Sequence, residues 1–339
     1  MKRGRLACLA VLFAFVSGTA SAQGGFVTRF TPEGARISTF PVGLAEGQYM
    51  SFVERDATDR IYVGRIDSGH GTFQFNPNDE IAVFESDGFG PVLIIKGSTR
   101  NQNGLTFDAA GDLYFGAVVD GGALGENLVY RFTAAGAEID SFGLQLNDYT
   151  DFVTAPGDRI FALRNNNRDI VEFTTAGVQV NAISEFGRFG RLMALDETAT
   201  SLWTYQPKNG PHPPGDFLIQ YDLGLNELAT IDLEPHGNPR VAGLEVNAAG
   251  EILALLEDAR ILVFATDGTL LRTIDLELLT DANNLALASD GSLLVGHLNP
   301  IVSLAIPTLD FYGLVALALA LALLAAHRMA RHRGATRAN

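Results

Sequence analysis

Alternating apolar and polar residues, interrupted by turns that contain glycine, recur along the chain in two short phrases. In the first phrase, a strand with an aromatic residue leads through a turn ending in glycine into a second strand. Strict alternation predicts strands with one buried face, and the glycine turn predicts that the two strands form a hairpin. Clear copies are 29–37 (RFTPEGARI), 131–139 (RFTAAGAEI), 172–180 (EFTTAGVQV) and 263–271 (VFATDGTLL), and weaker copies turn at Gly88 and near Gly224.

The second phrase alternates with the first and also predicts a hairpin. Its clear copies are 105–115 (LTFDAAGDLYF), 152–161 (FVTAPGDRIF), 244–253 (LEVNAAGEIL) and 285–294 (LALASDGSLL), with weaker copies near Asp59 and Ala199. One hairpin of each kind makes a four-stranded sheet of about 45 residues, the size of one blade of a β-propeller. Six copies of each phrase therefore predict an all-β, six-bladed β-propeller.

The order of the hairpins predicts how the ring closes. The chain starts with a hairpin of the first kind (26–42) and ends with one of the second kind (283–298), so the two halves can combine into one blade and remove the open sheet edges. A further strand at 301–306 could compete for the same edge, which leaves seven blades as the alternative. The segment from Gly104 to Tyr114 (GLTFDAAGDLY) resembles NHL, SMP-30 and TolB-like six-bladed propellers. This resemblance implies a fold, not an activity.

The N-terminus has the three parts of a secretory signal peptide. Lys2, Arg3 and Arg5 precede a short apolar run, and Ala20 and Ala22 form an Ala-x-Ala cleavage site. A membrane anchor is the less favoured interpretation, because the run is too short to span a bilayer. We expect residues 1–22 to be removed, and with them Cys8, the only cysteine of the chain.

The C-terminus predicts a short hydrophobic helix followed by a basic tail. Residues 311–326 are uncharged, and Arg328, Arg331, Arg333 and Arg337 follow. Because basic residues stay on the cytoplasmic side, this transmembrane segment would leave the main domain outside the cytoplasm. We therefore expect a signal peptide at 1–22, a propeller at 23–305 and a C-terminal sorting and membrane segment at 306–339.

The start of this tail resembles the IPTL-CTERM sorting signal of Gram-negative bacteria. Its residues are Ile306, Pro307, Thr308 and Leu309, with Gly313 four residues further on, although Asp310, Phe311 and Tyr312 depart from the usual continuation. The resemblance implies that an exosortase-like membrane protease recognises the tail at the inner membrane and cuts near the motif. The protein would then reach the cell surface or the medium.

The charge of the propeller segment excludes some partners. Without the three basic residues of the leader and the four Arg and one Asp of the tail, 17 basic and 38 acidic side chains remain, a formal charge of −21. Such a surface repels nucleic acid, so we expect no nucleic-acid partner. With no cysteine left, the exported domain has no disulfide, thiol nucleophile or thiolate metal site.

Candidate ligand-binding residues lie where the chain leads into each predicted inner strand, at the mouth of the channel. Glu54, Asn103, Asp151 and Asn283 could hold Ca²⁺ or another divalent ion, as oxygen ligands do in SMP-30-like hydrolases, although polar residues that only cap strands would give the same pattern. The other polar residues at these positions are Tyr49, Asn101, Gln102, Asp148, Arg188, Arg191, Asn238, Arg240, Asp281 and Asn284.

These patterns favour a non-catalytic function. No catalytic residue and no required cofactor are assigned, and the favoured function is an envelope-associated binding or structural module for an unidentified protein or glycan. The alternative is a metal-dependent, lactonase-like hydrolase that acts in the channel.

Overall fold

The computed structural model describes residues 24–45, 47–67, 79–96, 100–119, 126–142, 149–164, 169–184, 192–196, 198–207, 216–237, 240–276, 279 and 281–298. They all belong to the first of the two units, Met1–Pro300 and Ile301–Asn339, into which the chain divides. The predicted C-terminal segment, including its sorting motif and helix, and the predicted signal peptide lie outside the described residues.

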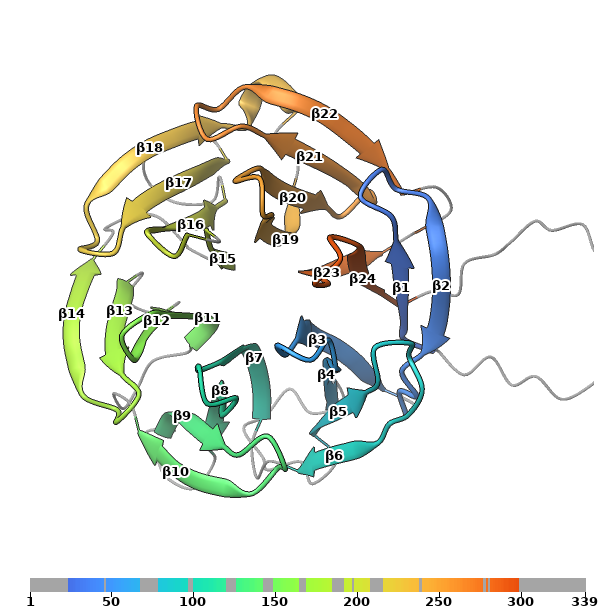
Figure 1. Ribbon diagram of the computed structural model, residues 1–339, viewed down its shortest axis with the longest axis vertical. Helices are drawn as coiled ribbons and strands as arrows, with labels where there is room; N and C mark the ends of the chain where they lie inside the picture. The colour runs from blue at the N-terminus through green and yellow to red at the C-terminus, as the bar shows by residue number, and fades with distance from the viewer. Residues whose placement is uncertain are drawn as a thin grey trace, which may run out of the picture. The chain divides into compact units, whose positions relative to one another are not determined.

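Six four-stranded antiparallel sheets form a closed ring around a central channel (Figure 1). This confirms the six-bladed prediction, and the seven-bladed alternative is wrong for the described part of the chain. Blade 1 contains β3 (Gln48–Arg55), β4 (Ile61–Asp67), β5 (Glu80–Phe84) and β6 (Leu93–Lys96). Blade 2 contains β7 (Arg100–Phe107), β8 (Leu113–Val119), β9 (Glu126–Phe132) and β10 (Glu138–Phe142).

The next blades follow the same order from the channel outwards. Blade 3 contains β11 (Tyr149–Ala155), β12 (Arg159–Arg164), β13 (Asp169–Thr174) and β14 (Gln179–Ser184). Blade 4 contains β15 (Leu192–Leu195), β16 (Ser201–Gln206), β17 (Phe217–Asp222) and β18 (Glu227–Asp232). Blade 5 contains β19 (Val241–Val246), β20 (Ile252–Leu256), β21 (Arg260–Phe264) and β22 (Leu270–Asp275), preceded by the short 3-10 helix η1 (Glu234–His236).

Blade 6 joins the two ends of the propeller. Its strand order is β2 (Arg36–Pro41), β1 (Phe26–Phe30), β24 (Leu293–His297) and β23 (Ala282–Leu287), which confirms the predicted closure. Every residue of β1 pairs with one of β24, from Phe26 opposite His297 to Phe30 opposite Leu293. The Thr28 hydroxyl is 2.8 Å from Nε2 of the buried His297, and the Phe26 ring stacks on the same imidazole.

Burial explains why the strands have different sequence patterns. The middle strands of each blade are covered on both faces by neighbouring blades, so β20 (ILALL) is an apolar run in which every residue is buried. The outermost strand β22 (LLRTID) has one buried residue, Ile274. The core lies between adjacent blades, where for example Phe40 and Phe84 approach to 5.3 Å between ring centroids.

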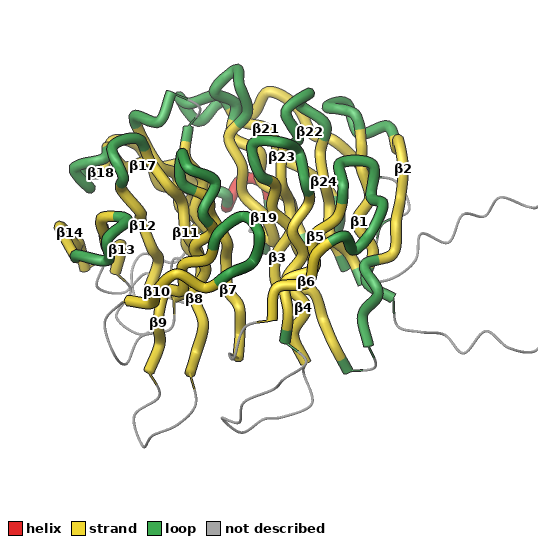
Figure 2. Tube along the Cα trace, turned by 60° about the horizontal axis from the view of Figure 1, so that its bottom comes forward, coloured by secondary structure: helices red, strands yellow, loops and turns green. Residues whose placement is uncertain are grey.

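All twelve predicted hairpin turns occur at the predicted positions. They gather at one end of the ring (Figure 2). The inner strands β23, β3, β7, β11, β15 and β19 contact one another in sequence around the channel. Because each inner strand runs towards its hairpin turn, their last residues surround the channel at this turn end.

Within the described residues, no helix is long and apolar enough to cross a membrane.

Candidate functional site

The described residues form two cavities in the channel, which lie one above the other along the inner strands. The larger, which we call the mouth cavity, has a volume of about 420 Å³ and is formed by the last residues of the inner strands and the turns that follow. The smaller, which we call the inner chamber, has a volume of about 60 Å³ and is formed by residues earlier in the same strands. Glu54 and Met193 line both.

The mouth cavity is at the end of the channel opposite to the one predicted. The prediction used the segments that lead into the inner strands, and several of those residues, among them Asp148, Arg188 and Asn238, lie outside the described part of the chain. The mouth cavity is instead built where the inner strands end, because the short hairpin turns leave the channel open there.

Strand register explains which side chains reach the cavity floor. One position in each inner strand pairs with a large buried residue of the second strand, as Glu54 pairs with Tyr62 and Glu245 with Leu253. The equivalent residues of the other blades are small or uncharged: Thr106, Val153, Ala194 and Ala286. Blades 1 and 5 therefore supply carboxylates at one level of the channel.

A third carboxylate, Asp151, lies two residues before Val153, the blade 3 residue at the position of Glu54, and it lines the inner chamber. Its Oδ1 accepts a hydrogen bond from the backbone N–H of Phe152 at 2.9 Å, and its Oδ2 accepts one from Met193 at 2.6 Å. The side chain thus joins β11 to β15. Gly104 makes room for it, since a Cβ at that position would be 2.7 Å from both Cα and Oδ1 of Asp151.

Glu54, Asp151 and Glu245, here called the channel carboxylates, hold their protons unusually tightly. Burial raises the pKa of Asp151 to about 7, against the lowering effect of its backbone hydrogen bonds from Met193 and Phe152. Burial, and then the charge of Asp151, raises the pKa of Glu245 to about 8, while Arg55 lowers it. Burial followed by the charges of Glu245 and Asp151 raises the pKa of Glu54 well above its usual range. Groups that titrate near neutral pH can exchange protons with a ligand or act as general acids and bases.

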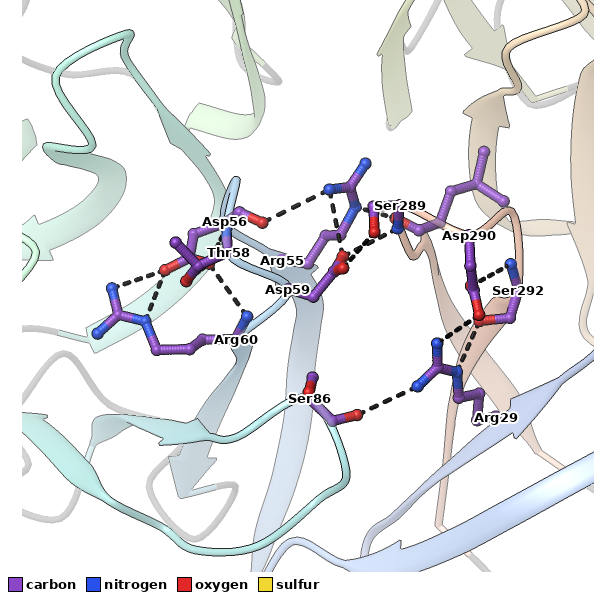
Figure 3. A network of polar contacts seen from close by, with 11 residues as sticks. Arg29, Arg55, Asp56, Thr58, Asp59, Arg60, Ser86, Ser289, Asp290 and Ser292 are labelled. Carbon is purple, nitrogen blue, oxygen red and sulfur yellow. Dashed lines mark hydrogen bonds and ion pairs between the residues drawn. The ribbon is translucent and has the colours of Figure 1, made fainter.

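A polar network fixes the rim of the mouth cavity between blades 1 and 6 (Figure 3). The Arg55 guanidinium donates to the Leu287 carbonyl oxygen and lies 3.4 Å from Asp59 Oδ1. Asp59 also accepts hydrogen bonds from the backbone and the hydroxyl of Ser289. These bonds hold Arg55 against the cavity wall.

Arg29, on β1, extends this network across the closing blade. Its guanidinium donates to Ser292 Oγ at 2.7 Å, to Asp290 Oδ2 at 2.8 Å and to the Ser86 carbonyl oxygen at 3.3 Å (Figure 3). One residue near the start of the domain therefore contacts the last hairpin and a turn of blade 1.

Of the four predicted metal ligands, the structure brings Glu54 and Asp151 together. The Nδ2 of Asn283 donates to the Met50 carbonyl oxygen at 3.3 Å, and its neighbour Asn284 lines the inner chamber. The side chain of Asn103 lies outside the described set, so the complete ligand set stays a prediction. Within the described residues, no group of three or more His, Cys, Asp or Glu side chains is placed to hold a metal ion.

Sequence reasoning missed Glu245, which belongs to a recognised copy of the second phrase. Aligning that copy with the weaker one around Asp59 places Glu245 at the position of Glu54, and this alignment could have identified the pair.

Comparison with known proteins supports both the fold and the tail. Residues 305–332 match the IPTL-CTERM motif. This sorting signal indicates an exported, surface-directed protein. A search of curated protein sequences found no match.

Solved structures show the same architecture at low sequence identity. The WD40 β-propeller domain of Doa1 has a TM-score of 0.55 and 14% identity, over 81% of this chain and 86% of that one. Streptogramin B lyase has a TM-score of 0.51 and 12% identity, over 81% and 98%. A protein of unknown function from Bacteroides caccae has a TM-score of 0.54 and 9% identity, over 78% and 98%. At these identities the likeness extends to the fold alone, and the chain is a six-bladed β-propeller that carries a C-terminal sorting motif.

Proposed function

We propose that this chain is an exported, surface-directed propeller that acts at the cell envelope as a binding or structural module for a protein or glycan. The observation that carries the proposal is the sorting motif at residues 305–332, which starts shortly after the last propeller strand ends at His297. The mouth cavity offers the binding site, since its 420 Å³ is within the range of about 300–1,000 Å³ typical of ligand pockets.

The proposed route uses both ends of the chain. Residues 1–22 direct export, and the apolar segment 311–326 holds the intermediate in the inner membrane with the propeller outside the cytoplasm. An exosortase-like protease then recognises residues 306–309 and releases the propeller towards the surface or the medium.

Mass spectrometry of the mature protein tests this route in a cell with matching sorting machinery. We expect an N-terminus at Gln23 and a C-terminus near residues 306–309. Changing 306–309 to four alanines should leave the chain unprocessed at the inner membrane, whereas Asp310→Asn, beside the motif, should be processed normally. If Phe311 to Asn339 persist in the surface product, or if the four-alanine variant is sorted like the native chain, this route is wrong.

The second candidate is a metal-dependent, lactonase-like hydrolase. It is favoured by one observation, the approach of Glu54 and Asp151 in the channel, where carboxylate oxygens could bind Ca²⁺. Hydrolysis of lactones that depends on added Ca²⁺ and is lost in Asp151→Asn, but not in Asp267→Asn on an exposed turn, would support it. Equal rates with and without Ca²⁺ would count against it.

A further inference from the structure

The mouth cavity combines an apolar wall with an acidic floor. Leu105, Phe107 and Leu195 contribute to the wall, and Glu54 and Glu245 lie at the floor, where blades 1 and 5 place them at the same level. Cavities of this composition suit a ligand with a cationic end and an apolar stem, and an aromatic ring such as Phe107 adds attraction for a cation.

The carboxylates at the rim already accept hydrogen bonds from residues in or next to their own turns. Asp56 accepts hydrogen bonds from Thr58, Arg60 and Tyr62, and Asp108 from the backbone of its turn and from Tyr114. These interactions shape the rim and leave little capacity for a ligand.

The floor differs from the rim because its carboxyl groups have fewer such partners. Only the backbone N–H of Arg55 donates to Glu54, and within the described residues no group donates a hydrogen bond to Glu245. Arg55 is the cationic side chain that lines the cavity, and it is tied to Leu287 and Asp59. A carboxylate deep in a protein without a partner is unfavourable, so a cationic ligand would gain by pairing with it.

The available oxygens suit an organic cation better than Ca²⁺. Calcium takes about 6–8 oxygen ligands. Both oxygens of Asp151 already accept backbone hydrogen bonds, whereas Glu54 accepts one and Glu245 none within the described residues, so these two have the most acceptor capacity left for a ligand. An ammonium group has three donors and places its alkyl stem on apolar surface, as lysine side chains do.

We propose that the mouth cavity binds an alkylammonium group, with the charge between Glu54 and Glu245 and the stem against the apolar wall. The group could belong to a free amine or to the lysine side chain of a partner protein. This inference rests on the proposed binding function and names the chemistry that its cavity recognises.

Titration calorimetry on the purified full-length chain tests the inference with pentylammonium as the probe and 1-pentanol as its neutral counterpart. We expect pentylammonium to bind at least about tenfold more tightly than 1-pentanol, since one charge-assisted hydrogen bond accounts for about this difference. Glu245→Gln and Glu54→Gln should each weaken pentylammonium binding by about tenfold or more. Glu257→Gln, which removes the same charge from an exposed site, should bind like the native chain.

The pH dependence provides a second readout. Binding should strengthen from pH 6 to pH 9, because Glu245, whose pKa is raised to about 8, must ionise while the ammonium, with a pKa of about 10.4, stays charged. Asp151 and Arg55 face the same carboxylates, and Asp56 and Asp108 lie at the rim; of these, Asp151 also titrates near neutral pH and adds to the trend.

Two further ligands identify the source of the group. Tighter binding of a short peptide with an internal lysine than of 1,5-diaminopentane indicates a protein partner, and the reverse order indicates a free amine; either supports the inference. Equal affinity for pentylammonium and 1-pentanol, unchanged binding by Glu245→Gln, or Ca²⁺ binding that pentylammonium does not displace would overturn it. None of these outcomes alters the processing assay, so this inference can fail while the export route stands.

Discussion

Replacing Glu245 by glutamine should stabilise the protein, and the gain should increase with pH. Burial and the charge of Asp151 raise the pKa of Glu245 to about 8, whereas an unfolded glutamate titrates near about 4.3. The folded state therefore binds this proton more tightly, and the stability that the proton provides is lost as pH rises from about 4 to about 8. At about 1.4 kcal/mol per pKa unit, the full loss is on the order of 5 kcal/mol.

Glutamine keeps the size of the side chain and removes the charge. Because the Glu245 side chain keeps some exposure to solvent, part of this penalty is relieved, and we expect Glu245→Gln to increase the free energy of unfolding by about 2–4 kcal/mol at pH 9 and by less than about 1 kcal/mol at pH 5. The trend with pH follows from the sign of the pKa shift, since only the ionised carboxylate is unfavourable in the fold.

Urea denaturation at pH 5, 7 and 9 measures this gain for Glu245→Gln and for the control Glu257→Gln. Glu257 is exposed and paired with Arg240 at 3.4 Å, so its substitution should change stability by less than about 0.5 kcal/mol at each pH. A gain for Glu245→Gln that is equal at pH 5 and pH 9 would show that Glu245 ionises in the fold without penalty. A loss of stability at pH 9 would refute the reasoning altogether.

Three further substitutions test the packing of the ring, each read as the change in free energy of unfolding. Thr28→Val should destabilise the protein by about 1–3 kcal/mol because it removes a hydrogen-bond partner of the buried His297. Thr39→Val, which removes an exposed hydroxyl that contacts the Thr28 hydroxyl, should change the stability by less than about 1 kcal/mol. Equal effects of the two would refute the role of the buried bond. Gly88→Ala should destabilise the protein by about 1–3 kcal/mol more than Gly111→Ala. Both glycines have a positive φ, but a Cβ at Gly88 would lie 2.3 Å from the Phe40 ring, whereas a Cβ at Gly111 would have no neighbour within 4 Å. Trp203→Ala should destabilise by about 3–5 kcal/mol, since the ring is fully buried between blades 4 and 5, and a loss below about 1 kcal/mol would contradict that packing.

The fold could be predicted because each hairpin carries its own local signal. A turn such as Gly34 or Gly268 needs a positive φ, which glycine adopts readily, and the structure has φ of 91° and 87° at these positions. The weaker copies of the second phrase lack this marker, because Asp59 and Ala199 take the positive φ themselves. Their hairpins could be placed only from the spacing of the stronger copies.

The site was harder to predict because it depends on register between blades. The alternation that places Glu245 in a strand does not show whether the residue faces the channel, and its equivalents in other blades include Val153 and Ala286. A carboxylate at this position is therefore not part of the repeat. Which residues form the mouth cavity depends on how the turns of six blades meet in three dimensions, and no local pattern encodes that.

The closure of the ring links the two ends of the chain to its sorting. The Thr28–His297 contact joins residues 269 positions apart, and bringing such distant segments together costs about 3 kcal/mol more loop-closure entropy than forming a hairpin of about ten residues. The full β1–β24 ladder and the bonds of Arg29 to the last hairpin offset this cost. Because β24 ends at His297 and the sorting motif begins at residue 305, the ring can close only when nearly all of the chain before the motif has been made. We therefore expect the ring to form only where both ends of the propeller are present together.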